Sequence, residues 1–227
     1  MRMQQKLSIK EIIKREKRCR ALGQDIMCDW DFAHDNGQNP DATGIARKYV
    51  EHFDEIRKEG YGLFLYGGAG AGKSFVAAQI VNALTDKGYR CLFTAMGTVM
   101  IELQTLSFEN RRNYLRQLCD KDLLVLDDFG SEMETAYSNQ ILTQIVNMCH
   151  SKSIPIIVTT PYHQDVLTRE NCNPKRLLSV RRLLQRSISY TVMMPGERRS
   201  RMLQQKQMSE ALLKGKTYAA QQALALQ

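Results

Sequence analysis

Eight consecutive residues have the types and the spacing that bind phosphate. A glycine, four further residues and then Gly-Lys-Ser make up the stretch Gly67-Gly68-Ala69-Gly70-Ala71-Gly72-Lys73-Ser74. This pattern predicts a phosphate-binding loop when a strand precedes it and a helix follows it. Backbone N–H groups would surround the phosphate oxygens, and the positive end of the following helix would face the same oxygens. We therefore expect residues Gly67 to Phe75 to bind ATP or ADP.

Two side chains at the end of this loop have separate predicted roles. Lys73 would reach the outer phosphates, and the hydroxyl of Ser74 would hold Mg²⁺. The flanking sequence has the required form, because residues 61–66 are an apolar run of strand length and residues 75–86 have the apolar spacing of a buried helix. This context favours a nucleotide site over a glycine-rich turn that happens to end in Lys-Ser.

A second apolar run, residues 122–129, carries two adjacent carboxylates near its end, Asp127 and Asp128. A parallel strand would present this pair at the carboxyl edge of the sheet, where the phosphate-binding loop also lies. Asp127 would support Mg²⁺ through water. Asp128 would orient or deprotonate the water that attacks the γ-phosphate. The alternative is a surface pair that only caps a strand.

The elements that must position these residues alternate between strands and helices. Strands are expected at residues 61–66, 89–94, 122–129, 155–160 and 187–194. Helices are expected at 1–24, 43–59, 75–86, 98–106, 111–119, 136–151, most of 163–187 and from 196 onward, with a loop at 25–42. The central strands are apolar throughout rather than alternating, which predicts an α/β fold with a parallel sheet buried on both faces by helices.

Composition favours one globular domain with tails. The chain has 227 residues, of which 43% are hydrophobic and 25% charged, enough to bury a core. It lacks the run of roughly 20 apolar residues that a membrane span needs, and its basic start lacks an apolar signal core, so we expect a cytoplasmic protein. The six cysteines include no CxxC pair, which argues against a compact zinc module, and we expect reduced thiols, most of them in the core. They are Cys19, Cys28, Cys91, Cys119, Cys149 and Cys172.

Positive charge is concentrated at the two ends of the chain. Residues 1–20 hold eight Lys or Arg and two acids, and residues 175–227 hold eleven and two, while the whole chain has a net charge of +8. Basic ends on an acidic body suggest contact with nucleic acid or an acidic partner, although they could also be solvated helix faces. The first segment also has a short apolar face of Leu7, Ile9, Ile12 and Ile13. It could be an arm that binds a partner or DNA, or a helix packed on the domain.

The phosphate-binding loop and the acidic strand together resemble those of a known family. The chain looks like the AAA+ ATPases of the bacterial replicative helicase loader (DnaC/DnaI-like) and IstB-like group, over about residues 30–200. The matching stretches are residues 62–67, the run Leu123-Leu124-Val125-Leu126-Asp127-Asp128-Phe129-Gly130, residues 155–160 and the basic helix at 181–186. Two adjacent Asp, an apolar residue and Gly are typical of this group.

The resemblance implies further site residues. The end of the fourth strand usually presents a polar sensor of the γ-phosphate, and Thr160 is the matching residue. Pro161 follows it where many relatives have Asn, a departure that would accompany slow hydrolysis. An arginine finger is implied after this strand, acting on a neighbouring subunit's ATP. Arg186 is our first choice and Arg182 the second, the alternative being a basic face toward DNA or solvent.

The same resemblance implies a function and an organisation. We expect a basic helix and linker at 1–40, an AAA+ core at 41–195 and a helical tail at 196–227, without a full C-terminal lid. The implied function is Mg²⁺-dependent ATP hydrolysis that helps to load a replicative DNA helicase onto single-stranded DNA, with homo-oligomers forming when ATP is bound. An IstB-like transposition helper that binds DNA and recruits a transposase is the alternative, and a nucleotide-dependent interaction module without hydrolysis is a third. Three arginines could reach single-stranded DNA or form a solvated helix face: Arg111, Arg112 and Arg116.

Overall fold

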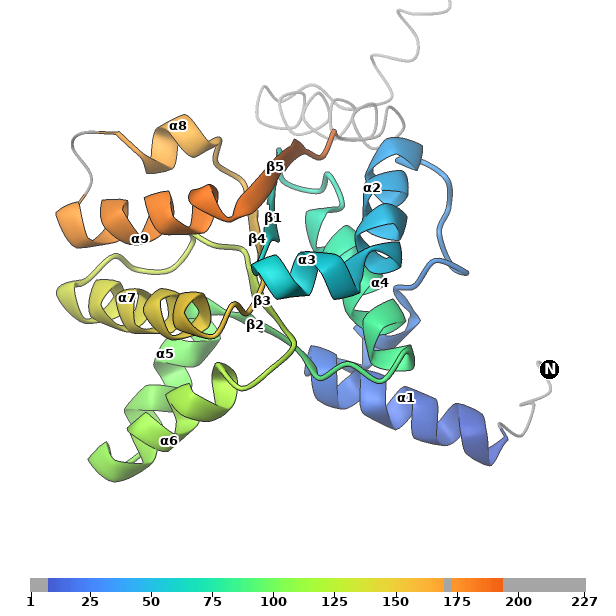
Figure 1. The fold of residues 1–227 in the computed structure, drawn as a ribbon, viewed down its shortest axis with the longest axis horizontal. Helices are drawn as coiled ribbons and strands as arrows, with labels where there is room; N and C mark the ends of the chain where they lie inside the picture. Colours follow the sequence, from blue (N-terminus) through green and yellow to red (C-terminus); the bar gives the residue numbers. More distant parts are fainter. Residues whose placement is uncertain (1–7, 170–172, 194–227) are drawn as a thin grey trace, which may run out of the picture.

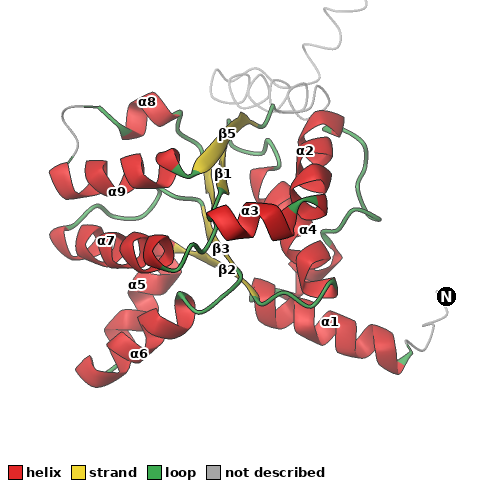
Figure 2. Cartoon of the chain, in the orientation of Figure 1, coloured by secondary structure: helices red, strands yellow, loops and turns green. Residues whose placement is uncertain are grey.

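A computed structural model describes residues 8–169 and 173–193. Its centre is a five-stranded sheet with helices on both faces (Figure 1; Figure 2). The strands are β1 (Gly62–Tyr66), β2 (Cys91–Ala95), β3 (Leu123–Asp127), β4 (Ile156–Thr160) and β5 (Ser187–Thr191). Their order is β2-β3-β4-β1-β5, and every neighbouring pair is parallel. The predicted α/β fold with a parallel sheet is therefore confirmed.

Two hydrophobic cores lie on opposite faces of this sheet. One is covered by α1 (Ile9–Leu22), the 3₁₀ helix η1 (Asp25–Asp29), α2 (Pro40–Glu51), α3 (Phe53–Glu59) and α4 (Lys73–Asp86). The other is covered by α5 (Met96–Thr105), α6 (Phe108–Leu118), α7 (Ala136–Ser151) and α9 (Pro174–Gln185), and a short helix α8 (Gln164–Leu167) precedes α9. Burial on both faces explains why the central strands carry apolar runs rather than an alternation of apolar and polar residues.

The helix expected over residues 43–59 is two helices, because the chain turns at His52 between α2 and α3. The turn directs Phe53 into the core, where its ring and that of Tyr89 form a T-shaped pair with a centroid distance of 4.8 Å. The segment expected to be a loop at 25–42 contains η1 and the start of α2. The last strand ends at Thr191, and the helix expected from 196 lies outside the described residues.

Helix α1 packs on the domain through its last turns. Arg18 is 8% exposed, and its guanidinium binds the carboxylates of Asp31 and Asp86, at 2.8 Å and 2.6 Å. The first turns differ, since Ile9, Ile12 and Ile13 are 76%, 52% and 47% exposed. The helix thus combines a packed end with an exposed apolar face. Among the described residues, no helix is both long and apolar enough to cross a membrane.

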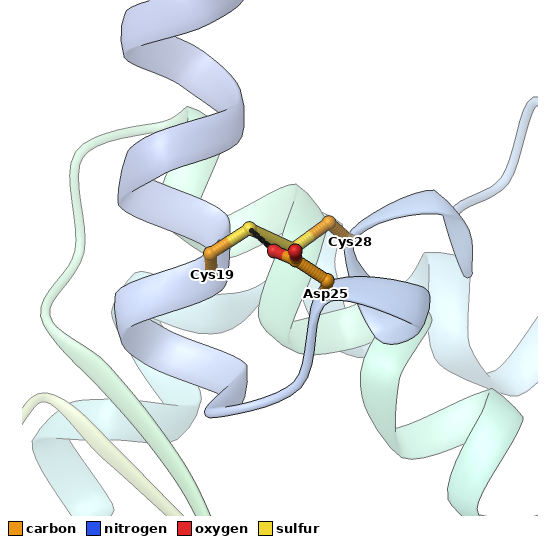
Figure 3. Close-up of side chains that lie close together, drawn as sticks. All are labelled: Cys19, Asp25 and Cys28. Carbon is orange, nitrogen blue, oxygen red and sulfur yellow. Dashed lines mark hydrogen bonds between the residues drawn. A yellow bond between two sulfur atoms is a disulfide. The ribbon is translucent and has the colours of Figure 1, made fainter.

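The expectation of six reduced thiols is wrong for one pair. Figure 3 shows a disulfide between Cys19, near the end of α1, and Cys28 in η1, with Cα atoms 5.7 Å apart. Asp25 lies beside it, with a carboxylate oxygen 3.1 Å from the sulfur of Cys19. A helix end folding back onto a 3₁₀ turn brings the two cysteines together, and their sequence spacing does not reveal this. Cys91, Cys119 and Cys149 are buried free thiols as expected, and Cys172 lies outside the described residues.

Candidate nucleotide-binding site

The phosphate-binding loop connects the end of β1 to the start of α4, as the sequence predicts. Gly67 has a φ of +153°, and a Cβ there would lie 2.3 Å from the backbone oxygen of Val192. Gly72 has a φ of +96° and stands just before α4, without a side chain that caps the helix. Glycine is required at both places, because a side chain would clash at the first and strain the backbone at the second. The first N–H groups of α4 have no acceptor within the helix and no capping side chain, so they are available to a ligand at the loop.

Lys73 lies folded over this loop. Its side chain donates hydrogen bonds to the backbone oxygens of Gly67 and Gly68, at 2.8 Å and 3.0 Å. Burial lowers the pKa of Lys73, while the negative charges of Asp128 and Asp127 act in the opposite direction. Lys73 begins the helix that follows β1, Asp127 ends β3, and β4 lies between these two parallel strands, so the loop and the acids share the rim at the carboxyl ends of the strands. A phosphate-binding loop with its lysine beside two carboxylates is the arrangement expected of a nucleoside triphosphate site.

Thr159 joins the two acids and was not predicted as a site residue. Its hydroxyl donates to Oδ1 of Asp127 at 2.5 Å and accepts from the backbone N–H of Asp128 at 2.9 Å. It is fully buried in β4, next to β3 in the sheet. Its neighbour Thr160, the predicted sensor, is also fully buried and pairs with Tyr66, the last residue before the loop. The hydroxyl of Thr160 accepts from the backbone N–H of Tyr162 at 3.2 Å.

The backbone of Asp128 adopts a left-handed conformation, with a φ of +50°. This conformation is uncommon for residues other than glycine and is often found at functional sites. Ser131 stabilises the turn by donating its hydroxyl to the backbone oxygen of Asp128 at 2.6 Å. The side chain of Asp128 is exposed, whereas that of Asp127 is half-buried. The turn thus presents Asp128 to the rim and keeps Asp127 close to the sheet.

The oxygen donors at the rim suit Mg²⁺, which prefers hydroxyl, carboxylate and water ligands and carries several waters when bound to protein. Ser74 lies in the first turn of α4, and Asp127 ends β3. The bond from Thr159 fixes one carboxylate oxygen of Asp127, so that the orientation of the group is set before any ion binds. Ser74 and Asp127 would hold the ion, as the sequence predicts.

Both predicted arginine fingers lie near the amino ends of the strands, whereas the loop lies at their carboxyl ends. Arg186 follows α9, and its backbone oxygen accepts from the N–H of Gly62 at the start of β1. Its side chain donates to the backbone oxygen of His150 at 3.2 Å, and Arg182 donates to the side chain of Asn147. The length of β1, about 3.3 Å per residue, therefore separates Arg186 from the loop of the same chain. Either arginine would have to act on a neighbouring subunit.

A cavity beside the loop contains residues that sequence reasoning missed. It is lined by Ala71, Gly72 and Phe75 and by residues of the segment before α2, among them Asp35 and Asn39. Asn39 donates to the backbone oxygen of Ala71 at 3.0 Å, tying this segment to the loop. Asp35 and Asn39 come from an irregular segment, and no local pattern marks them.

Comparisons with known proteins agree with this geometry. Residues 22–168 match the family described as IstB-like ATP binding protein. The replicative helicase loader DnaC of Escherichia coli K12 is 31% identical over 133 residues, which are 56% of this chain and 52% of the relative. A putative insertion sequence ATP-binding protein of Sinorhizobium fredii is 31% identical over 111 residues, 48% of this chain and 37% of the relative. The chain therefore spans about half the length of the DnaC relative and a smaller share of the insertion-sequence relative.

A solved structure shows that the fold is shared. The crystal structure of DnaI matches with a TM-score of 0.63 at 19% identity, covering 74% of this chain and 94% of that one. At this identity the likeness concerns the fold alone, and it confirms the parallel sheet with flanking helices. The family match spans more than half of the chain and contains both the loop and the acids. The chain belongs to the family of IstB-like ATP-binding proteins.

Proposed function

We propose that this chain binds ATP with Mg²⁺, hydrolyses it, and uses the cycle to help load a replicative DNA helicase onto single-stranded DNA. The observation that carries the proposal is the placement of Lys73 and the two acids at the carboxyl ends of nearby parallel strands, on one rim of the sheet. Bound Mg²⁺ would offset the charge of the phosphates. Asp128 would orient or deprotonate the attacking water, and Thr160 would contact the γ-phosphate.

ATP would also control assembly. The loop and the arginine fingers lie at opposite edges of the sheet, so one subunit's ATP can meet only a neighbour's Arg186 or Arg182. ATP held between the two subunits would favour a homo-oligomer, and loss of the γ-phosphate would weaken the joint.

A groove between α6 and α7 supports binding of single-stranded DNA. Arg111, Arg112 and Arg116 line it together with Tyr137, and Phe108 stands at its edge, 87% exposed. Guanidinium groups neutralise phosphates, and exposed rings stack on bases of any sequence. The groove thus has the chemistry of a site for unpaired nucleic acid.

The exposed face of α1 supports contact with a partner protein. Ile9, Ile12 and Ile13 stand out from a helix whose other end is anchored by the buried Arg18. An apolar strip on a rigidly held helix can enter a groove on another protein. We propose that this strip contacts the helicase.

The relative among insertion-sequence proteins supports a second candidate, a transposition helper that recruits a transposase and binds duplex DNA. Capture experiments separate the two. The chain, loaded with ATP, should retain purified replicative helicase and not the transposase encoded beside insertion sequences. The substitutions Ile9→Ser and Ile13→Ser should remove this capture without changing ATP turnover. Retention of transposase alone would favour the second candidate.

An ATPase assay tests hydrolysis. Asp128→Asn should leave ATP binding intact and stop turnover, because the amide can neither accept a proton nor hold the attacking water in the same way. Absence of turnover in the unsubstituted chain, with and without single-stranded DNA, would instead favour a nucleotide-dependent interaction module. Pro161 beside the sensor is the feature that would account for that result.

A further inference from the structure

A buried ion pair connects the turn of the acids to α9. A carboxylate oxygen of Glu132 lies 2.8 Å from the guanidinium of Arg176, and the two side chains are 4% and 7% exposed. Glu132 follows the acids by a few residues, and Arg176 lies in the first turn of α9. Separating the two side chains of a buried pair leaves each charge uncompensated, which strongly destabilises the protein. The two side chains are therefore expected to stay in contact.

Both partners also bind the acidic turn. The second carboxylate oxygen of Glu132 accepts from the backbone N–H of Gly130 at 2.8 Å. The guanidinium of Arg176 lies over the ring of Phe129, 4.8 Å from its centre. Phe129 and Gly130 directly follow Asp128, whose own backbone is strained. A shift of Asp128 would therefore reach Arg176 by two routes, the ring of Phe129 and the hydrogen bond between Gly130 and Glu132.

At its other end, α9 leads to the predicted arginine fingers. Arg182 lies in its last turn, and Arg186 ends it. A helix of this length moves as one body, because each residue is bonded to the next turn. A hydroxyl contact of 3.0 Å between Thr143 and Ser179 fixes its middle against α7. The first turn of α9 is thus tied to one ATP site, and its last turn carries residues that would serve another.

We propose that Glu132 and Arg176 are a positioning pair that couples the ATP site of one subunit to the arginine that the same subunit offers to its neighbour. The inference rests on the proposed function, since it requires ATP hydrolysis in an assembly. Neither residue contacts nucleotide in this scheme. Their role is to make the orientation of α9 depend on the state of the turn that contains Asp128.

Mixed assemblies test this coupling apart from any local effect. Wild-type subunits are mixed with an excess of Asp128→Asn subunits, and in parallel with an excess of subunits carrying both Asp128→Asn and Glu132→Gln. The excess subunits cannot hydrolyse ATP, so that their α9 can influence turnover only at a wild-type neighbour. We expect turnover per wild-type site to be lower in the second mixture by on the order of fivefold. Equal turnover in the two mixtures would overturn the proposal.

Two further variants separate loss of the coupling from a general folding defect. Glu134 also faces Arg176, at 3.9 Å, but is 45% exposed. Glu134→Gln in place of Glu132→Gln should therefore leave turnover in the mixture unchanged. If Glu132→Gln does not fold, as judged by its melting temperature, Arg176→Lys replaces it and should give the same direction of change, because it keeps the charge but loses the planar contact with Phe129.

The proposed function is checked first and separately. Turnover of the wild-type chain should rise per subunit as its concentration increases, since assembly completes each site. If it does not rise, the assembly itself is absent and both proposals fail. If it rises while the two mixtures remain equal, only the coupling fails.

Discussion

The hydroxyl of Thr159 bridges both acids of the site, because it donates to the carboxylate of Asp127 and accepts from the backbone N–H of Asp128. It does so from a neighbouring strand and is fully buried. A hydroxyl in this place uses both its donor and an acceptor lone pair, so no apolar side chain can replace it. Thr159 therefore sets the orientation of one acid and supports the strained backbone of the other.

The substitution Thr159→Val tests this role. It keeps the shape of the side chain and removes both bonds, which should lower turnover by on the order of tenfold while ATP affinity changes little. Thr159→Ser restores the hydroxyl and should recover most of the activity. Steady-state kinetics measures turnover, and calorimetric titration with a non-hydrolysable ATP analogue measures the affinity. A normal rate for the valine variant would show that the bridge has no part in turnover.

Lys73 gives a second prediction, at the phosphates. Its side chain is held by the backbone oxygens of Gly67 and Gly68, so it is already placed at the mouth of the loop. Lys73→Ala should abolish measurable ATP binding in calorimetry, because a buried positive charge facing the phosphates is lost. Lys87→Ala, at the other end of the same helix, serves as the control and should bind normally. Unchanged affinity in Lys73→Ala would refute the assignment of the loop.

The parts of the site that the sequence predicts are contiguous. The loop and the acidic pair each lie within a few residues, and the elements around them have clear apolar patterns, so position along the chain is enough to identify them. Thr159 differs, because its partners are on another strand and nothing in its own neighbourhood distinguishes it from Thr160. The register of β3 against β4 decides which hydroxyl faces the acids, and tertiary packing sets that register.

Contacts between distant segments were missed for the same reason. Glu132 and Arg176 meet across 44 residues, and each alone resembles an ordinary charged residue on a helix or loop. Cys19 and Cys28 meet because a helix ends at Gly23 and the chain reverses there, with Gly23 in the left-handed conformation. Such pairings depend on how two elements are oriented, and periodicity within one element carries no information about that.

The buried ion pairs of Arg18 predict a pH dependence of stability. Burial would raise the pKa of Asp31, but hydrogen bonds from Arg18 and His34 outweigh it and lower the pKa to about 2. A carboxyl whose pKa is lower in the folded protein stabilises it above the unfolded pKa of about 4 and loses that contribution as the pH falls toward 2. The stability difference between the wild-type chain and Asp31→Asn should therefore shrink between pH 4 and 2.

Urea unfolding at a series of pH values measures this difference. Asp29→Asn is the matched control, because Asp29 pairs with Arg15 at the surface, where both side chains are about half exposed. Its effect should be small at every pH, as for other exposed pairs. A constant offset between wild type and Asp31→Asn from pH 7 down to 2.5 would contradict the role of Arg18 and His34.

The arginine fingers provide the last prediction. Arg186 lies at the amino edge of the sheet, where its side chain binds the backbone of His150, far from the loop of its own chain. Arg186→Ala should therefore leave ATP binding by isolated subunits unchanged and lower turnover in the assembled state by at least about tenfold, since transition-state charge on the phosphates would lack its partner.

Complementation identifies which arginine acts. A subunit with Arg186→Ala retains an intact loop, and a subunit with Lys73→Ala retains an intact Arg186, so neither should be active alone. Mixing them should restore turnover, because each supplies what its neighbour lacks at the shared site. Arg182→Ala is tested in the same way. Recovery by complementation for Arg182→Ala together with normal turnover for Arg186→Ala would move the finger one turn back along α9.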